Sequence, residues 1–429
     1  MRAVGIEPTS SPWIAFIWLA RECGQGAFDS GVTANGAAEG DGHGWLTPIR
    51  LPRERGQCVG LIRLFLALVV ALDHLRDILL LPVGLNIPAW PKLGMNAGYA
   101  VMFFYMISGF LISTGLSRKY PPDRAGALAF YQSRFIRIFS LYWPMALGTT
   151  LMLGQTQAFW QADVGDKFTS TFLLGADWRV AFANYPAPHS GALTAAMHQA
   201  WTLGAELTFY ILAPFILRLP RLAVMLFGAS ALTRAFMVHR YGFSDIWTYY
   251  FAPSTFLFFL LGHFAREAGD KWAALKNLPV LGCGLVAVAI LSLIAPDYAG
   301  WDSPRFWISA TCFAASLPSI FEATHRSRLL TTIGDLSYTV YLVHVICILY
   351  VVYFFGKSFE RLVPLGEAGA LIGAVPVLAG VVAIAAVVHW VIERPVGAAM
   401  RSMMRGTADL IGYLTEKRPA QPLAPKQID

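Results

Sequence analysis

Charged residues are scarce in this chain of 429 residues. Asp, Glu, Lys and Arg make up 14% of it, while 56% is hydrophobic, whereas a typical soluble domain carries about 25% charge. A water-soluble globular fold is therefore excluded, because its surface could not be covered with charge, and a disordered body is excluded by the high hydrophobicity. The net charge of +7 then indicates no nucleic-acid partner; the positions of the positive charges carry the information.

Cysteine and the common soluble catalytic motifs are also missing or sparse. The five cysteines are scattered and include no CxxC pair, so neither a disulfide framework nor a zinc site is expected, and no metal is predicted. The chain has no GxSxG elbow, Walker loop, HExxH or GxGxxG after a strand, which argues against the soluble hydrolase, nucleotide-binding and metalloprotease classes. A polytopic membrane protein remains.

Long hydrophobic runs are what the chain has instead. A helix that crosses a bilayer needs about 17–25 mostly apolar residues, and ten stretches fit, whereas 171–183 is too short and is predicted to be an external loop. The stretches lie near 60–81, 97–116, 138–155, 199–217, 221–238, 247–265, 278–295, 305–322, 336–355 and 370–392. They predict an all-α membrane bundle of about ten transmembrane helices.

The distribution of positive charge predicts how this bundle is oriented. If the N-terminus is cytoplasmic, 23 of the 33 Lys and Arg residues fall on the inner side and 9 on the outer, with Arg63 inside the first stretch. Because cytoplasmic loops are enriched in Lys and Arg, both termini are predicted to be cytoplasmic. An even number of crossings requires the same arrangement.

The ends of the chain differ from its body. Residues 1–58 are rich in Gly and Ala and lack the features of a signal peptide, so they are either a flexible extension or the product of a misassigned start codon. Residues 59–398 are predicted to form the membrane domain, and 399–429 a disordered cytoplasmic tail. Pro395 is expected to end the tenth helix.

The first stretch carries two ionisable residues, Arg63 and His74, although such residues cost about 2.5–3.5 kcal/mol inside a membrane. Over the eleven residues between them, a helix rotates to within about 20° of three full turns. The two side chains therefore share one face and lie about 16 Å apart along the helix axis. The small Ala67 and Val70 lie between them, which predicts a cavity that both side chains line, with Asp77 orienting the imidazole. The alternative is that each side chain reaches its own membrane interface.

Further polar residues interrupt the next three stretches. Ser108 and Gly109 either allow close helix packing or leave room for a thin ligand. Arg134 and Arg137, at i and i+3, suit a phosphate-bearing ligand, or are ordinary cytoplasmic anchors. Glu206 lies well inside an apolar helix and is expected to be paired, protonated or functional.

Two more polar positions occur near the C-terminal end. His344, in the ninth stretch, either takes part in function or hydrogen-bonds a neighbouring helix. Glu393 and Arg394 are expected to form a structural cap or an interfacial salt bridge.

Six motifs in one order make the chain resemble the acyltransferase 3 family of bacterial integral-membrane O-acyltransferases, which modify surface and exported glycans. The resemblance covers about residues 59–398. Its motifs are Arg63-x10-His74, SGFL at 108–111, Arg134 and Arg137 followed by LYWP at 141–144, WTLGAELTFY at 201–210, SYTVYLVH at 337–344 and IERP at 392–395.

The resemblance implies a multi-pass protein of the bacterial inner membrane that uses cytoplasmic acyl-CoA, most often acetyl-CoA, as donor substrate, with no permanently bound cofactor. The implied partners are this donor, a glycan or other hydroxyl-bearing acceptor and the lipid bilayer. His74 and Arg63 match the essential residues of the signature, and Arg134 and Arg137 the basic positions on the donor side. Many members carry an Asp where this chain has Met102, and Glu206 and Asp77 are the nearest substitutes.

These residues together predict a mechanism. His74 acts as general base or relays the acyl group, and Arg63 positions the donor or stabilises the oxyanion. Arg134 and Arg137 hold the CoA phosphates; we also assign Ser108 to donor binding and Glu206 to catalysis. The pantetheine arm is expected to run along the stripe between Arg63 and His74.

Two alternatives to an enzyme remain at this point: a proton-coupled transporter or exporter of a glycan or lipid-linked substrate, and a non-catalytic membrane partner of a glycan-synthesis complex. The absence of repeated halves and of paired broken helices argues against a transporter. The sequence fixes neither the acceptor nor the acyl chain nor the oligomeric state. Acceptor choice is predicted to reside in outer loops such as 156–198.

Overall fold

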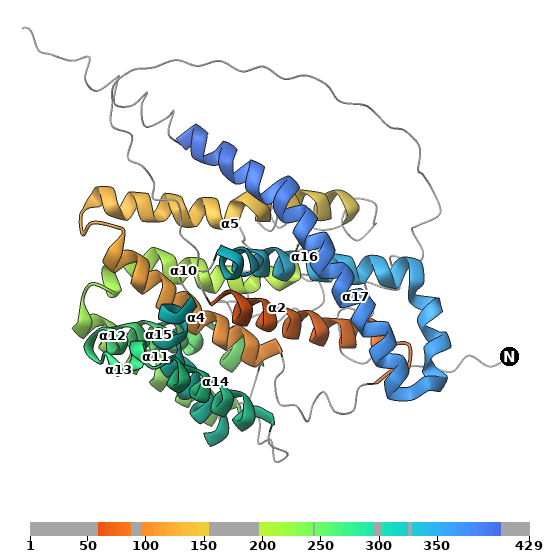
Figure 1. Cartoon of the computed structure of the whole chain (residues 1–429), viewed down its shortest axis with the longest axis horizontal. Helices are drawn as coiled ribbons and strands as arrows, with labels where there is room; N and C mark the ends of the chain where they lie inside the picture. Colours follow the sequence, from red (N-terminus) through yellow and green to blue (C-terminus); the bar gives the residue numbers. More distant parts are fainter. Residues whose placement is uncertain are drawn as a thin grey trace, which may run out of the picture.

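A computed structural model of the chain describes residues 59–86, 97–153, 197–242, 245–294, 303–324 and 328–404 (Figure 1). Within these ranges every regular element is helical and no strand occurs, so the predicted all-α class is confirmed. Residues 1–58 and the tail after 404 lie outside the described residues. So does the predicted outer loop 156–198 up to residue 196, including the segment 171–183.

Each of the ten apolar stretches falls on a helix. The ten helices, two of them continued by a π turn, are α2 (Gly60–Leu75, then η1, Arg76–Leu80), α4 (Ala97–Arg118), α5 (Arg124–Leu153), α10 (Trp201–Ile216), α11 (Pro220–Tyr241), α12 (Ala252–Lys271), α14 (Pro279–Ile294), α15 (Pro304–Thr324), α16 (Arg328–Phe359) and α17 (Gly366–Val388, then η5, His389–Glu393). The short elements are η2 (His198–Ala200), η3 (Asp245–Tyr250), α13 (Ala274–Asn277) and η4 (Glu360–Leu365).

Several of these helices have the properties of membrane spans. In the described part of the chain, 4 helical stretches are long and apolar enough to cross a bilayer: 97–118, 220–241, 304–324 and the continuous run 332–404. α11 also turns large apolar side chains outward, with Met225 70% and Leu232 72% exposed, as expected of a helix that faces lipid. A count of ten crossings and the cytoplasmic termini stay predictions.

α4 lies at the centre of the bundle, with α12 and α15 packed on one side and α2 on the other (Figure 1). Two glycines allow α4 and α12 to touch. A Cβ on Gly109 would lie 1.8 Å from the carbonyl oxygen of Phe259, and one on Gly262 would lie 1.9 Å from that of Met106. Gly109 therefore serves close packing, and the interpretation that it leaves room for a ligand is wrong.

The helix that carries IERP does not end at Pro395, as the sequence analysis expected. The structure is helical from 394 to 404, beyond the predicted domain boundary at 398. The π turn η5 ends at Glu393, and Arg394 alone separates it from the proline. Wider turns of this kind accommodate a residue that cannot donate a backbone hydrogen bond, so the helix continues through it.

Candidate active site

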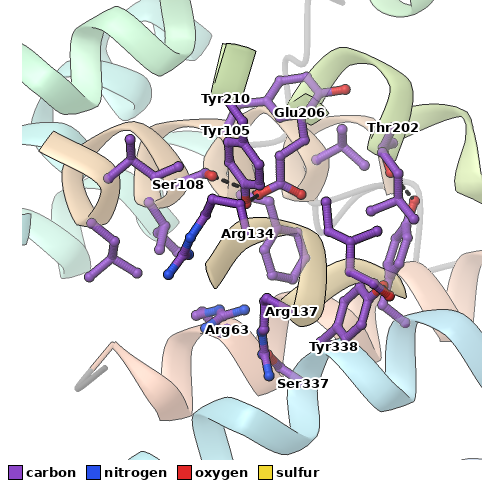
Figure 2. A pocket seen from close by; sticks show the side chains of 18 residues that line it. Arg63, Tyr105, Ser108, Arg134, Arg137, Thr202, Glu206, Tyr210, Ser337 and Tyr338 are labelled. Carbon is purple, nitrogen blue, oxygen red and sulfur yellow. Dashed lines mark hydrogen bonds between the residues drawn. The ribbon is translucent and has the colours of Figure 1, made fainter. Parts of the chain in front are cut away.

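A cavity of about 90 Å³ opens between α2, α4, α5, α10 and α16 (Figure 2). This is several times the space that one water molecule requires, so the cavity can admit a small polar group. Five of the six predicted site residues line it: Arg63, Ser108, Arg134, Arg137 and Glu206. Four different helices contribute these side chains, so the fold brings together residues that lie far apart in the sequence.

Three guanidinium groups give one side of the cavity its charge. Arg63, Arg134 and Arg137 gather there (Figure 2). Arg137 Nη1 lies 3.0 Å from Glu393 Oε1, and its guanidinium stands 5.1 Å from the ring centroid of Tyr338. Because α5 turns Arg134 and Arg137 toward the cavity, both cations reach a place where an anionic group could meet them.

Glu206 faces these cations from α10. Ser108 Oγ donates a hydrogen bond of 2.7 Å to Glu206 Oε1, and the Tyr210 hydroxyl, one turn further along α10, donates to the same oxygen. Figure 2 shows both hydroxyls directed at the carboxylate. The expectation that Glu206 is paired is confirmed, and two hydroxyl donors from α4 and α10 compensate for its place in an apolar helix.

His74 is not among the residues that line this cavity. Ala67 and Val70, which the sequence analysis expected to leave room beside it, are 0% and 1% exposed, and Ala67 packs in a buried cluster with Val340 and Val343 of α16. Small side chains here let α16 approach α2 closely instead of leaving a channel. The prediction of one cavity lined by both Arg63 and His74 is therefore wrong. The face of α2 between these two residues is packed and is not an open route.

The imidazole of His74 meets a second imidazole. His344 Nε2 lies 3.0 Å from His74 Nδ1, and the ring centroids are 5.0 Å apart. The hypothesis that His344 hydrogen-bonds a neighbouring helix is confirmed. Asp77, predicted to orient His74, instead accepts hydrogen bonds from the Arg76 guanidinium at 2.8 and 2.9 Å. The π turn that begins at Arg76 changes the rotation per residue, so the α-helical spacing used for that prediction does not apply.

Tyr341 connects the cavity with the histidine pair. Its side chain lines the cavity, and its ring centroid is 5.8 Å from that of His344, one turn away on α16. The hydroxyl donates to the carbonyl of Gln199 at 2.7 Å and accepts from Thr202 Oγ1 at 2.8 Å. Because the Tyr341 proton is used by a carbonyl, Thr202 must be the donor of the second bond.

The sequence analysis missed the tyrosines of the site. Tyr210 and Tyr341 lie inside the quoted motifs but were not singled out, because a tyrosine in an apolar helix looks like packing. Their hydroxyls could have been noticed as polar groups that need partners when buried. The predicted salt bridge of Glu393 with Arg394 is wrong, since Glu393 pairs with Arg137 and the guanidinium of Arg394 lies over the Trp390 ring.

Met102, where many relatives carry Asp, is fully buried in the main apolar core and is not part of the cavity lining. Of the two predicted substitutes, Glu206 lines the cavity and Asp77 is paired with Arg76. The described residues contain no cluster of three His, Cys, Asp or Glu side chains suited to a metal ion.

Comparison with known proteins gives two matches. A family model described as an acyltransferase domain matches residues 57–390. The chain is also similar to nodulation protein 10 of Rhizobium leguminosarum bv. viciae, with 27% identity over 304 residues, which cover 67% of this chain and 81% of the relative. No solved structure matches.

Proposed function

Since the chain belongs to the acyltransferase 3 family, we propose that this acyltransferase is a membrane O-acyltransferase that uses acyl-CoA, in the first place acetyl-CoA, from the cytoplasm. The proposed acceptor is a hydroxyl group of a cell-surface or exported polysaccharide or glycolipid. The proposed location is the bacterial inner membrane.

The observation that carries this proposal is the cavity with three converging guanidiniums, Arg63, Arg134 and Arg137. The phosphates of CoA are anions that guanidinium groups bind in bidentate fashion. Three cations brought to one small cavity by two helices are more than membrane anchoring requires, since an anchor is effective at the surface and needs no shared cavity. We assign Ser108 to the same donor-binding region, and Glu206, which accepts its hydrogen bond, keeps the proposed catalytic role.

The distance along α2 suggests how the two tasks, positioning the donor and taking up the proton, are divided between Arg63 and His74. Arg63 and His74 are separated by eleven residues, about 16 Å along a helix, a length that the extended pantetheine arm of CoA can span. This separation favours donor positioning for Arg63 over stabilisation of an oxyanion beside His74. Because the face of α2 between them is packed, we place the path of the arm past Tyr341, whose side chain borders both the cavity and the ring of His344.

The proposed chemical step is a direct transfer. His74 takes the proton of the acceptor hydroxyl while the oxygen of that hydroxyl bonds to the thioester carbonyl carbon. The carbon–sulfur bond then breaks, and the thiolate of CoA takes up the proton that His74 holds. The products are the O-acyl ester and CoA with a free thiol, and His74 returns to its neutral form.

The assay uses the full-length protein in proteoliposomes with radiolabelled acetyl-CoA and an oligosaccharide acceptor, and measures thiol release and ester formation. We expect His74→Ala to lower kcat by about 10²–10⁴-fold, the usual contribution of a general base. Arg134→Ala should raise KM for acetyl-CoA with a smaller effect on kcat, because it removes a binding contact.

The matched control for Arg134 is Arg221→Ala, which removes an exposed arginine of α11 outside the cavity and should leave both constants unchanged. A His74→Ala protein that inserts normally and keeps full transfer would refute the catalytic assignment. Counterflow of a glycan substrate without thiol release would instead support the transporter alternative.

A further inference from the structure

We propose that His344 is a positioning residue that sets the tautomer of His74, so that the Nε2 atom of His74 carries the lone pair that accepts the substrate proton. This inference rests on the proposed function, because it assigns the base of that reaction a buried partner.

The hydrogen bonds of His344 fix its own tautomer. His344 Nδ1 lies 3.2 Å from the carbonyl oxygen of Val340, and a carbonyl oxygen can only accept. Nδ1 of His344 therefore carries a proton. His344 is 0% exposed, and its ring nitrogens meet a backbone carbonyl and another imidazole, neither of which compensates a buried positive charge. The ring is neutral, and its Nε2 is an acceptor.

The tautomer of His74 follows from the groups that accept from its ring, which are His344 Nε2 and the backbone of Val70 on its own helix. Because His344 Nε2 accepts, the group 3.0 Å away must donate, so His74 Nδ1 carries the proton. A neutral imidazole has one N–H and one lone pair, which leaves the lone pair on His74 Nε2. This is the tautomer that a general base needs, and in serine hydrolases a buried carboxylate selects it in the same manner.

The burial of the two rings separates their roles. His74 is less buried than His344, which is sealed among Val340, Val343 and Tyr341 of its own helix and the facing α2. His344 therefore acts through His74 and does not touch the substrate. When His74 takes up the proton, the same hydrogen bond to His344 Nε2 becomes charge-assisted and stabilises the imidazolium.

The test compares two substitutions of His344 in the full-length protein. His344→Gln keeps an amide oxygen that accepts from His74 Nδ1, and His344→Leu keeps bulk but offers no acceptor. We expect His344→Leu to lower kcat at least about tenfold with KM for acetyl-CoA unchanged, and His344→Gln to recover most of that loss. His263→Leu is the matched control, since His263 is also buried and is bonded to Ser113 on α4, outside the cavity.

A second measurement does not depend on acyl transfer. Diethyl pyrocarbonate acylates the unprotonated nitrogen of neutral histidine, and mass spectrometry gives the rate at the His74 peptide. We expect this rate to fall severalfold in His344→Leu, and to stay near the wild-type rate in His344→Gln and His263→Leu. Wild-type protein that transfers no acetyl group would overturn the proposed function, while the labelling rates would still decide the tautomer. The role of His344 would be overturned if labelling and kcat were the same in both His344 variants and in the wild type. It would also be overturned if His344→Gln and His344→Leu lost the same share of kcat.

Discussion

Several polar side chains of this bundle are bonded to partners on other helices. An ionisable group in a membrane is expensive, and the cost is compensated when a second helix supplies a donor or acceptor. Such contacts specify which helices are neighbours, since each partner is fixed by chemistry as well as by shape. The pairs are Ser108 with Glu206, Arg137 with Glu393 and His74 with His344.

Glu393 is the most strongly connected of these side chains, and its removal should destabilise the protein. Its carboxylate is bonded to Arg137 at 3.0 Å, to Thr339 at 2.6 Å and to His389 at 2.8 Å. Breaking a buried pair from one side costs about 3–5 kcal/mol. We expect Glu393→Gln to fall near the lower limit, about 3 kcal/mol, because Asp335 also lies 3.8 Å from Arg137. Thermal unfolding in detergent measures the change.

Two further variants make this prediction specific. Glu360→Gln removes an exposed carboxylate of η4 and should leave the unfolding temperature unchanged. The double variant Arg137→Gln with Glu393→Gln should recover part of the lost stability, because the charge it leaves without Arg137, on Asp335, is 41% exposed to begin with. It should not recover affinity for the donor. A Glu393→Gln protein as stable as the wild type would show that Arg137 gains nothing from this carboxylate.

At the residue scale, the sequence identified the ionisable groups but not their partners. Arg63, Arg134, Arg137 and Glu206 stand out because charge in an apolar helix is costly, and all four line the cavity. The partner of His74 lies 270 residues away, and a single sequence contains no signal for a contact at that separation. Helical periodicity relates residues of one helix only.

At the scale of elements, the apolar runs predicted where helices occur, because a backbone in hydrocarbon must satisfy its hydrogen bonds internally. What periodicity could not predict were the π turns η1 and η5. η1 contains Asp77 and changes the rotation per residue there, and η5 ends shortly before Pro395, which was expected to end the helix. Nor could it predict that small residues such as Ala67 would bring a helix close instead of leaving a cavity.

The contact between α4 and α12 gives a prediction of its own. In Gly109→Ala the new Cβ would stand 1.8 Å from the carbonyl oxygen of Phe259. A backbone oxygen cannot rotate away as a side chain does, so the helices must separate, at a cost of about 1–3 kcal/mol. We expect a lower unfolding temperature and, because Ser108 is the preceding residue on α4, slower acyl transfer.

Gly228→Ala on α11 is the control for this variant. No heavy atom lies within 4 Å of a Cβ at that position, so the substitution should be neutral or should stabilise the helix by up to about 1 kcal/mol. The two variants make the same chemical change in two apolar helices, and they differ in whether another backbone is in contact. If both lowered the unfolding temperature equally, close packing of α4 on α12 would not be the cause.

At the scale of the whole molecule, the arrangement of the site requires a particular orientation in the membrane. If the termini are cytoplasmic, Arg134 and Arg137 lie in the cytoplasmic half of α5, and His74 lies toward the outer side. A donor that enters from the cytoplasm then meets the guanidiniums first, and an acceptor on the outer side meets the imidazole. The opposite orientation would separate each substrate from the residues proposed to bind it.

Four exposed positions test this orientation: Lys119, Tyr241, Lys271 and Lys357. Each is replaced singly by Cys in a protein whose own cysteines are changed to Ser, and is then treated with a membrane-impermeant maleimide in spheroplasts and in inverted vesicles. The alternation of ten crossings with an excess of cations inside predicts that 241 and 357 react in spheroplasts, and 119 and 271 in inverted vesicles. The reverse pattern would place the guanidinium cavity on the side without cytoplasmic acyl-CoA. Reaction of 119 and 241 from the same side would mean that the helices between them do not cross as predicted, because an odd number of crossings must separate those two positions.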